Sequence, residues 1–235
     1  MYNHNVYTIF MTHQLGIKTG TKFFDYFARK INYNYINRFN ECWVPDLEEE
    51  SESLAGQLSH PKRLPNVPVR YIGLLSRIKI DESGRKEYDT AAILSGPEPQ
   101  RTLFEKKVKA LLSNYSGNAI LVRGLLGEHK PIEELPQNIK QANHLDTKEM
   151  SALMQTSSVV VCRSGYSTVM DLLKIGRSAL LVPTPGQTEQ EYLAQRLQNL
   201  GYFLYRDQDS LEQDDIIKDI PAKKIAAEMF SLFEK

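Results

Sequence analysis

The stretch that decides the fold runs from residue 158 to residue 201 and reads SVVVCRSGYSTVMDLLKIGRSALLVPTPGQTEQEYLAQRLQNLG. It holds two short apolar runs, 159–161 and 179–182, and each is followed by a polar loop and then by apolar residues at helical spacing. β-Branched runs of this length are typical of strands buried in a parallel sheet. Gly176 stands where a left-handed residue would end the first helix. The stretch therefore predicts two consecutive strand–loop–helix units.

The loop of the first unit has the composition of an anion site. Loops of this kind lie at the carboxyl ends of parallel strands, where open α/β sheets bind ligands and the N–H groups of a helix N-terminus favour negative charge. Gly165 has no side chain, so a phosphate can approach its backbone closely. Ser164, Ser167 and Thr168 carry hydroxyl groups that can donate hydrogen bonds. The first loop therefore predicts a site for a diphosphate.

Asp171 has two interpretations from spacing alone. It follows the loop by about one helical turn, where its carboxylate can accept two hydrogen bonds from a ribose diol. In the alternative, Thr168 caps the helix and Asp171 is an exposed charge that favours the positive helix end by about 0.3–1 kcal/mol. The sequence pattern leaves both interpretations open.

Capping boxes predict two further helix starts, because Thr188 is followed by Glu191 and Asp146 is followed by Glu149. The remaining apolar runs predict strands at 6–11, 42–44, 69–72, 90–94, 119–123, 139–144 and 202–205.

The central stretch resembles the donor half of GT-B glycosyltransferases, in particular the family of UDP-N-acetylglucosamine transferases that complete the lipid-linked peptidoglycan precursor, with its dolichol-pathway relatives. In that family the position of Asp171 carries a glutamate that holds the ribose, and the position of Gln190 carries a glutamine that contacts the donor sugar. In this chain the acid is an aspartate, which is one methylene shorter than glutamate. Residues 189–191 read Glu-Gln-Glu, where the family has more amide side chains. The donor therefore need not be UDP-N-acetylglucosamine. The resemblance is carried by Arg163, Ser164, Gly165, Thr168, Asp171, Gly176, Pro183 and Gln190.

The resemblance implies an α/β fold of GT-B type, with a Rossmann-like parallel-sheet donor domain and a small or truncated N-terminal α/β part. Residues 73–77 resemble the Gly-x-x-x-Arg segment that leaves the first family domain. The domains are therefore predicted at 1–77 and 78–235, with a C-terminal helix at 223–233 that crosses back to the first domain. The residues implied in donor binding are Ser95, Gly96, His144, Leu145, Arg163, Ser164, Gly165, Ser167, Thr168, Asp171, Gln187, Glu189 and Gln190.

The N-terminal part would supply the acceptor side. His13 follows a predicted strand, in a loop that faces the acceptor in the family, and an imidazole pKa near 6.5 suits a catalytic base. The alternative is a loop histidine satisfied by backbone groups. In the predicted helix 21–36, Phe23, Phe27 and Ile31 form a stripe that we expect to pack in the core. A basic aromatic helix of this kind can also lie on a membrane surface, as in family members that act on lipid-linked acceptors.

Composition limits the class of protein. Lys plus Arg equals Asp plus Glu at 29 each, so the chain has no net positive charge that would attract a nucleic acid. Cys42 and Cys162 lie in apolar runs without metal-ligand neighbours, which predicts buried reduced thiols in a cytoplasmic protein. Peripheral contact with the inner face of the membrane is left open. No apolar run reaches the roughly 20 residues that span a bilayer. Neither a tightly bound metal nor a cofactor is expected.

The predicted function is transfer of a hexose or N-acetylhexosamine from a UDP-sugar to an acceptor hydroxyl, with inversion. The acceptor would be a lipid-linked or cell-surface glycan. Two alternatives are a donor-binding subunit that needs a partner chain and a nucleotide-sugar 2-epimerase. The Gly-rich loop that opens the family's first domain has no counterpart before Val6. We therefore expect a shortened chain, inactive alone, or one that pairs with another copy or another subunit.

Overall fold

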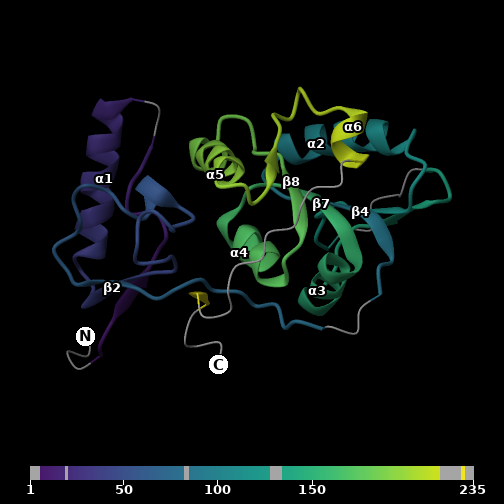
Figure 1. Cartoon of the computed structure of the whole chain (residues 1–235). Coiled ribbons are helices and arrows are strands. Elements are labelled where there is room, and N and C mark those ends of the chain that lie inside the picture. The colour runs from purple at the N-terminus through teal and green to yellow at the C-terminus, as the bar shows by residue number, and fades with distance from the viewer. Residues whose placement is uncertain (1–5, 19–20, 82–84, 128–133, 218–228, 231–235) are drawn as a thin grey trace. The chain divides into compact units, whose positions relative to one another are not determined.

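The computed structural model describes residues 6–18, 21–81, 85–127, 134–217 and 229–230. The chain divides into two compact units, Met1–Ser76 with Ala226–Lys235, and Arg77–Ile225 (Figure 1). Each unit is built on its own parallel sheet. The helix predicted at 223–233 lies almost wholly outside the described residues.

The larger unit confirms the predicted Rossmann-like architecture. Its six-stranded sheet has the order β6-β5-β4-β7-β8-β9, and every neighbouring pair is parallel. The strands are β4 (Tyr88–Ile93), β5 (Ala119–Val122), β6 (Ile139–Ala142), β7 (Ser157–Cys162), β8 (Ser178–Leu181) and β9 (Leu204–Tyr205). The helices are α2 (Gln100–Leu112), α3 (Thr147–Thr156), α4 (Tyr166–Ile175), α5 (Thr188–Asn199) and α6 (Gln213–Ile217).

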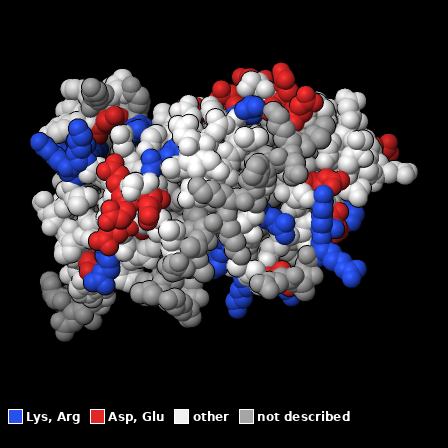
Figure 2. All heavy atoms as spheres, viewed as in Figure 1, with Lys and Arg blue, Asp and Glu red and all other residues white. Residues whose placement is uncertain are grey.

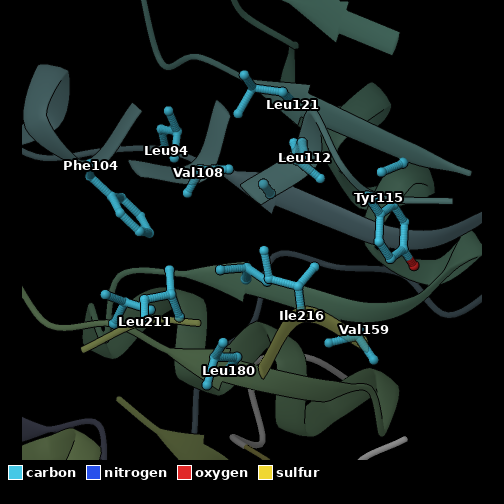
Figure 3. Close-up of a cluster of buried hydrophobic side chains, with 14 of the residues drawn as sticks. Leu94, Phe104, Val108, Leu112, Tyr115, Leu121, Val159, Leu180, Leu211 and Ile216 are labelled. Atoms are coloured by element: carbon cyan, nitrogen blue, oxygen red, sulfur yellow. The ribbon is translucent and has the colours of Figure 1, made fainter. Parts of the chain in front are cut away.

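Helices cover both faces of this sheet, which is why its strands are apolar on both sides. Figure 1 shows α2 and α3 on opposite sides of β4 and β7. Successive residues of β7 point to opposite faces, and 159–162 are buried throughout. Full burial of each such side chain stabilises the fold by about 1.5–3 kcal/mol. Figure 3 shows the cluster on the α2 face, where Phe104, Val108 and Leu112 of the helix lie across from Leu180, Leu211 and Ile216.

The strand order contains a switch point between β4 and β7. From β4 the chain adds β5 and then β6 on one side, and it returns to add β7, β8 and β9 on the other. Ile93 of β4 pairs with Cys162 of β7, so the two strands end in step. The loops that leave them diverge to opposite faces because parallel crossovers are right-handed. This is the position at which open α/β sheets bind ligands.

Helix ends confirm two local predictions and correct a third. Gly176 ends α4 in the left-handed conformation, with φ 63° and ψ 39°. Asp146 and Glu149 form the predicted capping box at α3. The box predicted with Thr188 is wrong, because Gln187 is the N-cap of α5 and makes no side-chain cap bond. Glu191 instead accepts a hydrogen bond from the N–H group of Gly186, at 2.9 Å.

The smaller unit has a three-stranded parallel sheet in the order β1-β2-β3. Its strands are β1 (Ile9–Met11), β2 (Glu41–Val44) and β3 (Val69–Tyr71), accompanied by α1 (Lys22–Ile36) and the 3-10 helix η1 (Gly56–Leu58). Its small core consists of Leu15, Ile36, Cys42 and Val44, with partly buried side chains around them.

The predicted core position of the α1 stripe is wrong. Phe23, Phe27 and Ile31 are 68%, 46% and 60% exposed, and among the described side chains of α1 only Ile36 is buried. A sheet of three short strands offers too little apolar surface to cover an aromatic helix of four turns. The helix itself, predicted at 21–36, is confirmed.

Glu105 is the centre of a buried ion network in the larger unit. Its carboxylate lies 2.6 Å from Arg101, 2.6 Å from Arg123 and 3.0 Å from Lys109. Burial alone would raise the pKa of the carboxyl group, but the hydrogen bonds from these cations outweigh it and lower the pKa to about 2. Arg123 also donates to the Asn143 side chain at 2.9 Å, so the network joins α2 to the segments that follow β5 and β6.

We expect Glu105→Gln to lower the free energy of unfolding at neutral pH by about 3–5 kcal/mol, because it leaves buried cations without their carboxylate. The folded-state pKa lies below the ordinary 4.5, so the stabilisation is fully present above that pH and is lost as the pH falls towards 2. Urea unfolding across this pH range measures both effects.

Glu87→Gln is the matched control, because Glu87 pairs with Lys140 at 3.3 Å and its side chain is 54% exposed. We expect it to cost less than about 1 kcal/mol. Equal effects of the two substitutions would show that the buried network does not stabilise the fold.

Candidate functional site

Three loops of the larger unit meet at the carboxyl edge of the sheet. They are 94–99 between β4 and α2, 163–165 between β7 and α4, and 182–187 between β8 and α5. A Cβ atom added at Gly96 would lie 3.6 Å from Thr184 Oγ1, so the first and third loops are neighbours. Ser95 and Gly96 are exposed there. The switch point and the loop neighbours thus bring the predicted phosphate-binding loops to one edge.

The start of α4 is open. Gly165 is its N-cap and makes no side-chain cap hydrogen bond, so Thr168 does not cap the helix as the alternative interpretation required. A Cβ atom added at Gly165 would meet no atom within 4 Å. The first turn carries no acidic residue, and Ser167 is exposed. These features suit an anion held by the N–H groups of the helix.

Ser164 ties this loop to α5. It is fully buried, and its hydroxyl donates to the carbonyl of Gln190 at 2.8 Å. A serine hydroxyl has a single proton to donate. The structure therefore gives Ser164 a role in fixing the loop, in place of the predicted donation to a phosphate.

The Arg163 side chain links the segments around these loops by hydrogen bonds. Its side chain is buried, with 3% of the residue exposed. The guanidinium donates at 2.7–3.1 Å to four oxygens, namely the carbonyls of Val182, Pro183 and Gln100 and the side chain of Gln208. The four acceptors belong to the β8–α5 loop, the start of α2 and the segment after β9. The structure thus places the Arg163 side chain in the loop framework, and not at the open start of α4.

The positive charge of Arg163 has no carboxylate partner within the part of the chain that the structure describes. Burial lowers the pKa of its guanidinium to about 10, which still leaves it charged at neutral pH. The guanidinium carbon lies 4.2 Å from the centre of the Phe104 ring, a cation–π contact worth up to about 2 kcal/mol when desolvated. An unneutralised cation under the loops favours an anion above them.

Asp171 is buried, which the sequence did not predict. It is 3% exposed, and its Oδ2 atom lies 3.5 Å from Arg77 Nε. The Arg77 side chain is 63% exposed, so the ion pair opens on one side to solvent. Gln155 holds the segment that carries Arg77, because it accepts from the N–H group of Asp81 at 2.7 Å and donates to the carbonyl of Lys79 at 3.2 Å. Asp171 is thus a fixed, largely desolvated acceptor.

Three predicted donor-binding residues lie together at the start of α5, namely Gln187, Glu189 and Gln190. The Gln190 side chain accepts from the N–H group of Thr184 at 2.9 Å and donates to the Gln187 side chain. Glu189 and Gln190 are both half-buried. The Gln190 side chain thus helps to order the β8–α5 loop with its oxygen and one of its two amide N–H groups.

His144 and Leu145 follow β6 at the edge of the sheet, two strands away from β4. His144 is exposed and Leu145 is half-buried. The neighbouring Asn143 is held by Arg123, so the Glu105 network fixes the loop that carries both residues. His13 belongs to the other unit, where it follows β1 and is half-buried.

Two residues of this site were not predicted from the sequence. Arg77 was considered only as a boundary marker, although its guanidinium contacts Asp171. Thr184 was not singled out, and its hydroxyl is buried without a hydrogen-bond partner, 3.6 Å from the position of a Cβ atom added at Gly96. Both contacts join segments far apart in sequence, so no local pattern could have indicated them.

Two classes of feature are missing from the described part of the chain. No helix there is long and apolar enough to cross a bilayer. No group of three or more His, Cys, Asp or Glu side chains could hold a metal ion there. Cys42 and Cys162 are free and buried, as predicted.

Comparison with known sequences agrees with this geometry. Residues 102–229 match the profile of the glycosyltransferase family 28 C-terminal domain. The UDP-N-acetylglucosamine–N-acetylmuramyl-(pentapeptide) pyrophosphoryl-undecaprenol N-acetylglucosamine transferase of Methylorubrum extorquens (strain PA1) is 38% identical over 89 residues, which are 37% of this chain and 22% of that protein. The enzyme of the same name from Methylobacterium radiotolerans is 51% identical over 47 residues, 20% of this chain and 13% of that protein. The matched residues thus span about a fifth or less of these relatives.

Solved structures show the same fold at low sequence identity. The calicheamicin glycosyltransferase CalG4 has a TM-score of 0.58 and 11% identity, covering 90% of this chain and 59% of that chain. The kitacinnamycin glycotransferase has a TM-score of 0.57 and 14% identity, covering 79% and 46%. SnogD from Streptomyces nogalater has a TM-score of 0.53 and 14% identity, covering 86% and 55%.

The family match covers more than half of the chain, and the neighbouring structures have the GT-B fold. The chain therefore belongs to glycosyltransferase family 28, whose C-terminal domain it carries.

Proposed function

We propose that this protein transfers a sugar from a nucleoside diphosphate sugar, with UDP as the nucleotide, to an acceptor hydroxyl. The observation that carries the proposal is the open start of α4 at the switch point between β4 and β7. Family membership gives the reaction class, since the matched profile is that of a glycosyltransferase domain. The choice of UDP rests on the relatives' printed names and on Asp171 as an acceptor for the ribose.

The chemistry at α4 is stabilisation of a leaving diphosphate. The acceptor oxygen forms a bond to the anomeric carbon while the bond from that carbon to the diphosphate oxygen breaks, and attack from the opposite face inverts the configuration. Negative charge then builds up on the diphosphate. The N-terminal dipole of α4, the exposed hydroxyl of Ser167 and the buried charge of Arg163 favour this charge.

We assign the acceptor proton to His13, whose imidazole would take it as the new bond forms. The transferred group is a hexose or N-acetylhexosamine, and we propose Gln187, Glu189 and Gln190 as its contacts because they lie together at the start of α5. Ser95 and Gly96 would contact the diphosphate, and His144 with Leu145 would face the base. The acceptor is a lipid-linked or cell-surface glycan, by analogy with the transferases named above.

Two other functions remain as proposals of lower rank. A donor-binding subunit would bind UDP but transfer sugar only with a partner chain. A 2-epimerase would need acidic and histidine side chains around the sugar, and the three loops that meet at the carboxyl edge, 94–99, 163–165 and 182–187, carry no histidine and only Glu98 as an acid. We place the protein in the cytoplasm, because both of its cysteines are free.

The exposed apolar side chains of α1 and the edge strand β1 suggest association. Phe23, Phe24 and Ile31 are each at least 60% exposed, and Met11 of β1 is 51% exposed. Exposed clusters of this kind mark contact surfaces. We propose that a second copy or a further chain segment covers them, with a membrane surface as the alternative occupant.

The carboxylate of Asp171 gives the first prediction. If it holds the ribose diol, Asp171→Asn should weaken UDP binding roughly 10- to 100-fold, the equivalent of about 1.5–3 kcal/mol. Calorimetric titration with UDP measures the change. Asp89→Asn is the matched control, because Asp89 is also ion-paired, at 2.8 Å to Lys86, but begins β4 at the opposite edge of the sheet.

UDP affinity that stays unchanged in Asp171→Asn, alongside a lowered melting temperature, would leave Asp171 with a structural role only. Equal losses in the Asp171 and Asp89 variants would point to general destabilisation.

Gln190 gives a prediction about the sugar. Gln190→Glu keeps the oxygen that accepts from Thr184 but loses the amide donor. We expect it to weaken binding of UDP-N-acetylglucosamine about tenfold relative to UDP. Gln198→Glu is the control on the same helix, since Gln198 also accepts from a backbone N–H group, that of Tyr205 at 2.8 Å. If both variants change the UDP-sugar to UDP ratio equally, Gln190 does not contact the sugar.

Association is tested by light scattering at micromolar concentration. We expect a dimer or larger species that shifts to monomer when Phe23 and Ile31 are both changed to Ser. A monodisperse monomer of the unmodified protein would contradict the proposal.

A further inference from the structure

A pocket of the larger unit lies along α3. Its volume of about 520 Å³ is in the range of pockets that enclose a small organic molecule. Thr147 and Thr156, the first and last residues of the helix, both line it. Because α3 starts at the carboxyl edge of the sheet and ends where β7 begins, at Ser157, the pocket extends away from the loops of the candidate site.

The second wall of the pocket is the segment 77–81, which is fixed to α3. Ile78 of this segment is buried. Gln155 of α3 is also buried, and its side chain donates to the carbonyl of Lys79 at 3.2 Å and accepts from the N–H group of Asp81 at 2.7 Å. The same amide lies 3.2 Å from the carbonyl of Ser151, one turn earlier on the helix. Both walls are therefore held in place by contacts within the chain.

Cations reach the pocket from both walls. Arg77 and Lys79 belong to the segment, Lys148 belongs to α3, and Asp81 is the single acidic residue among the described residues of the lining. Within the described ranges, the Lys79 and Lys148 ammonium groups form no ion pair. Figure 2 shows Lys and Arg side chains over the region that α3 occupies in Figure 1. An anion between these cations would relieve their mutual repulsion.

The hydroxyl of Ser151 is available as a further donor. Its oxygen accepts from the Gln155 amide at 3.2 Å, so its single proton is left for another acceptor. Thr147 lies one turn before Ser151 on the same face of α3. A phosphate ester carries a charge of about −2 and three strong acceptor oxygens, which match ammonium, guanidinium and hydroxyl donors. The lining therefore suits a phosphate better than a neutral or cationic group.

Arg77 belongs both to this pocket and to the ion pair with Asp171. Its Nε atom lies 3.5 Å from Asp171 Oδ2, which is longer than the roughly 2.8 Å of a strong charge-assisted hydrogen bond. The Arg77 side chain is largely exposed, so close packing does not confine it to this position. A phosphate in the pocket would compete with Asp171 for the guanidinium and weaken the ion pair.

We propose that this pocket is an effector site for a small phosphate monoester. The phosphate lies between Lys79 and Lys148, accepts from Ser151 and draws Arg77 towards it. Asp171 then accepts more strongly from the ribose hydroxyls of the donor, so the ester and UDP strengthen each other's binding. This coupling rests on the proposed donor site, but the binding of the ester does not.

The test is NMR titration of the whole chain with glycerol 3-phosphate, glucose 6-phosphate and phosphoserine, which share the phosphate and differ in the attached group. Inorganic phosphate and the three unphosphorylated parent compounds are the comparison probes. Saturating UDP occupies the donor site. We expect at least one ester to bind roughly tenfold or more tightly than inorganic phosphate and than its own parent. If no ester binds more tightly than inorganic phosphate, the proposal is wrong.

Paired variants with the same change of charge locate the binding. Lys79→Gln with Lys148→Gln should weaken the ester roughly tenfold or more. Arg85→Gln with Lys106→Gln removes two cations of the same unit that do not line the pocket, and should leave the affinity within about twofold. All four side chains are exposed, so the melting temperature should change little in either pair. Equal effects of the two pairs would overturn the assignment to this pocket.

The coupling is measured as the affinity for UDP with and without the ester that binds. We expect the ester to raise UDP affinity roughly fivefold or more. The rise should disappear in Arg77→Gln, which has no guanidinium to exchange between Asp171 and the phosphate. UDP affinity that the bound ester leaves unchanged or lowers would overturn the effector role.

The two proposals fail in different ways. If UDP does not bind the chain, the donor assignment fails, while titration of the esters against the paired variants without UDP still decides whether the pocket binds them. If UDP displaces the ester, the ester was bound in the donor site and the pocket proposal is wrong.

Discussion

A buried guanidinium organises the loops at the carboxyl edge of the six-stranded sheet. Arg163 leaves β7 at the switch point and donates to oxygens of three other segments, while Phe104 covers its face. Burying an uncompensated cation costs several kcal/mol, and the hydrogen bonds to fixed carbonyl groups offset that cost only while the loops keep their positions. The same side chain therefore fixes the loops and places positive charge beneath them, which would favour the diphosphate that we propose as ligand.

The strands and helices that position the site could be predicted from the sequence, because they follow from local patterns. The apolar run at 159–161, the stop at Gly176 and the capping box at Asp146 depend on periodicity and on nearby backbone groups. Strand order did not follow from such patterns, and the switch point between β4 and β7 emerged only from the pairing of strands. That switch point is what brings Gly96 and Gly165 to one edge of the sheet.

Long-range contacts and burial could not be predicted in the same way. The capping interpretation took Asp171 as an exposed charge, but the segment carrying Arg77, nearly a hundred residues earlier, contacts it and it is buried. Ser164 and Gln190 were assigned to ligand contacts, yet their polar atoms already bind protein groups across the loops. The stripe of α1 was expected in the core, and the small β1-β2-β3 sheet cannot cover it. In each case the deciding partner lies elsewhere in the chain, where helical or strand periodicity carries no information.

We propose that a nucleoside diphosphate binds at the start of α4, at the switch point of the six-stranded sheet. A crystal structure of the chain with UDP tests it most directly. We expect density for the diphosphate beside the N–H groups that follow Gly165, with the ribose hydroxyls within hydrogen-bond distance of Asp171 and the base towards the loop after β6. A UDP molecule bound at any other edge of the sheet, or ribose hydroxyls remote from Asp171, would contradict it.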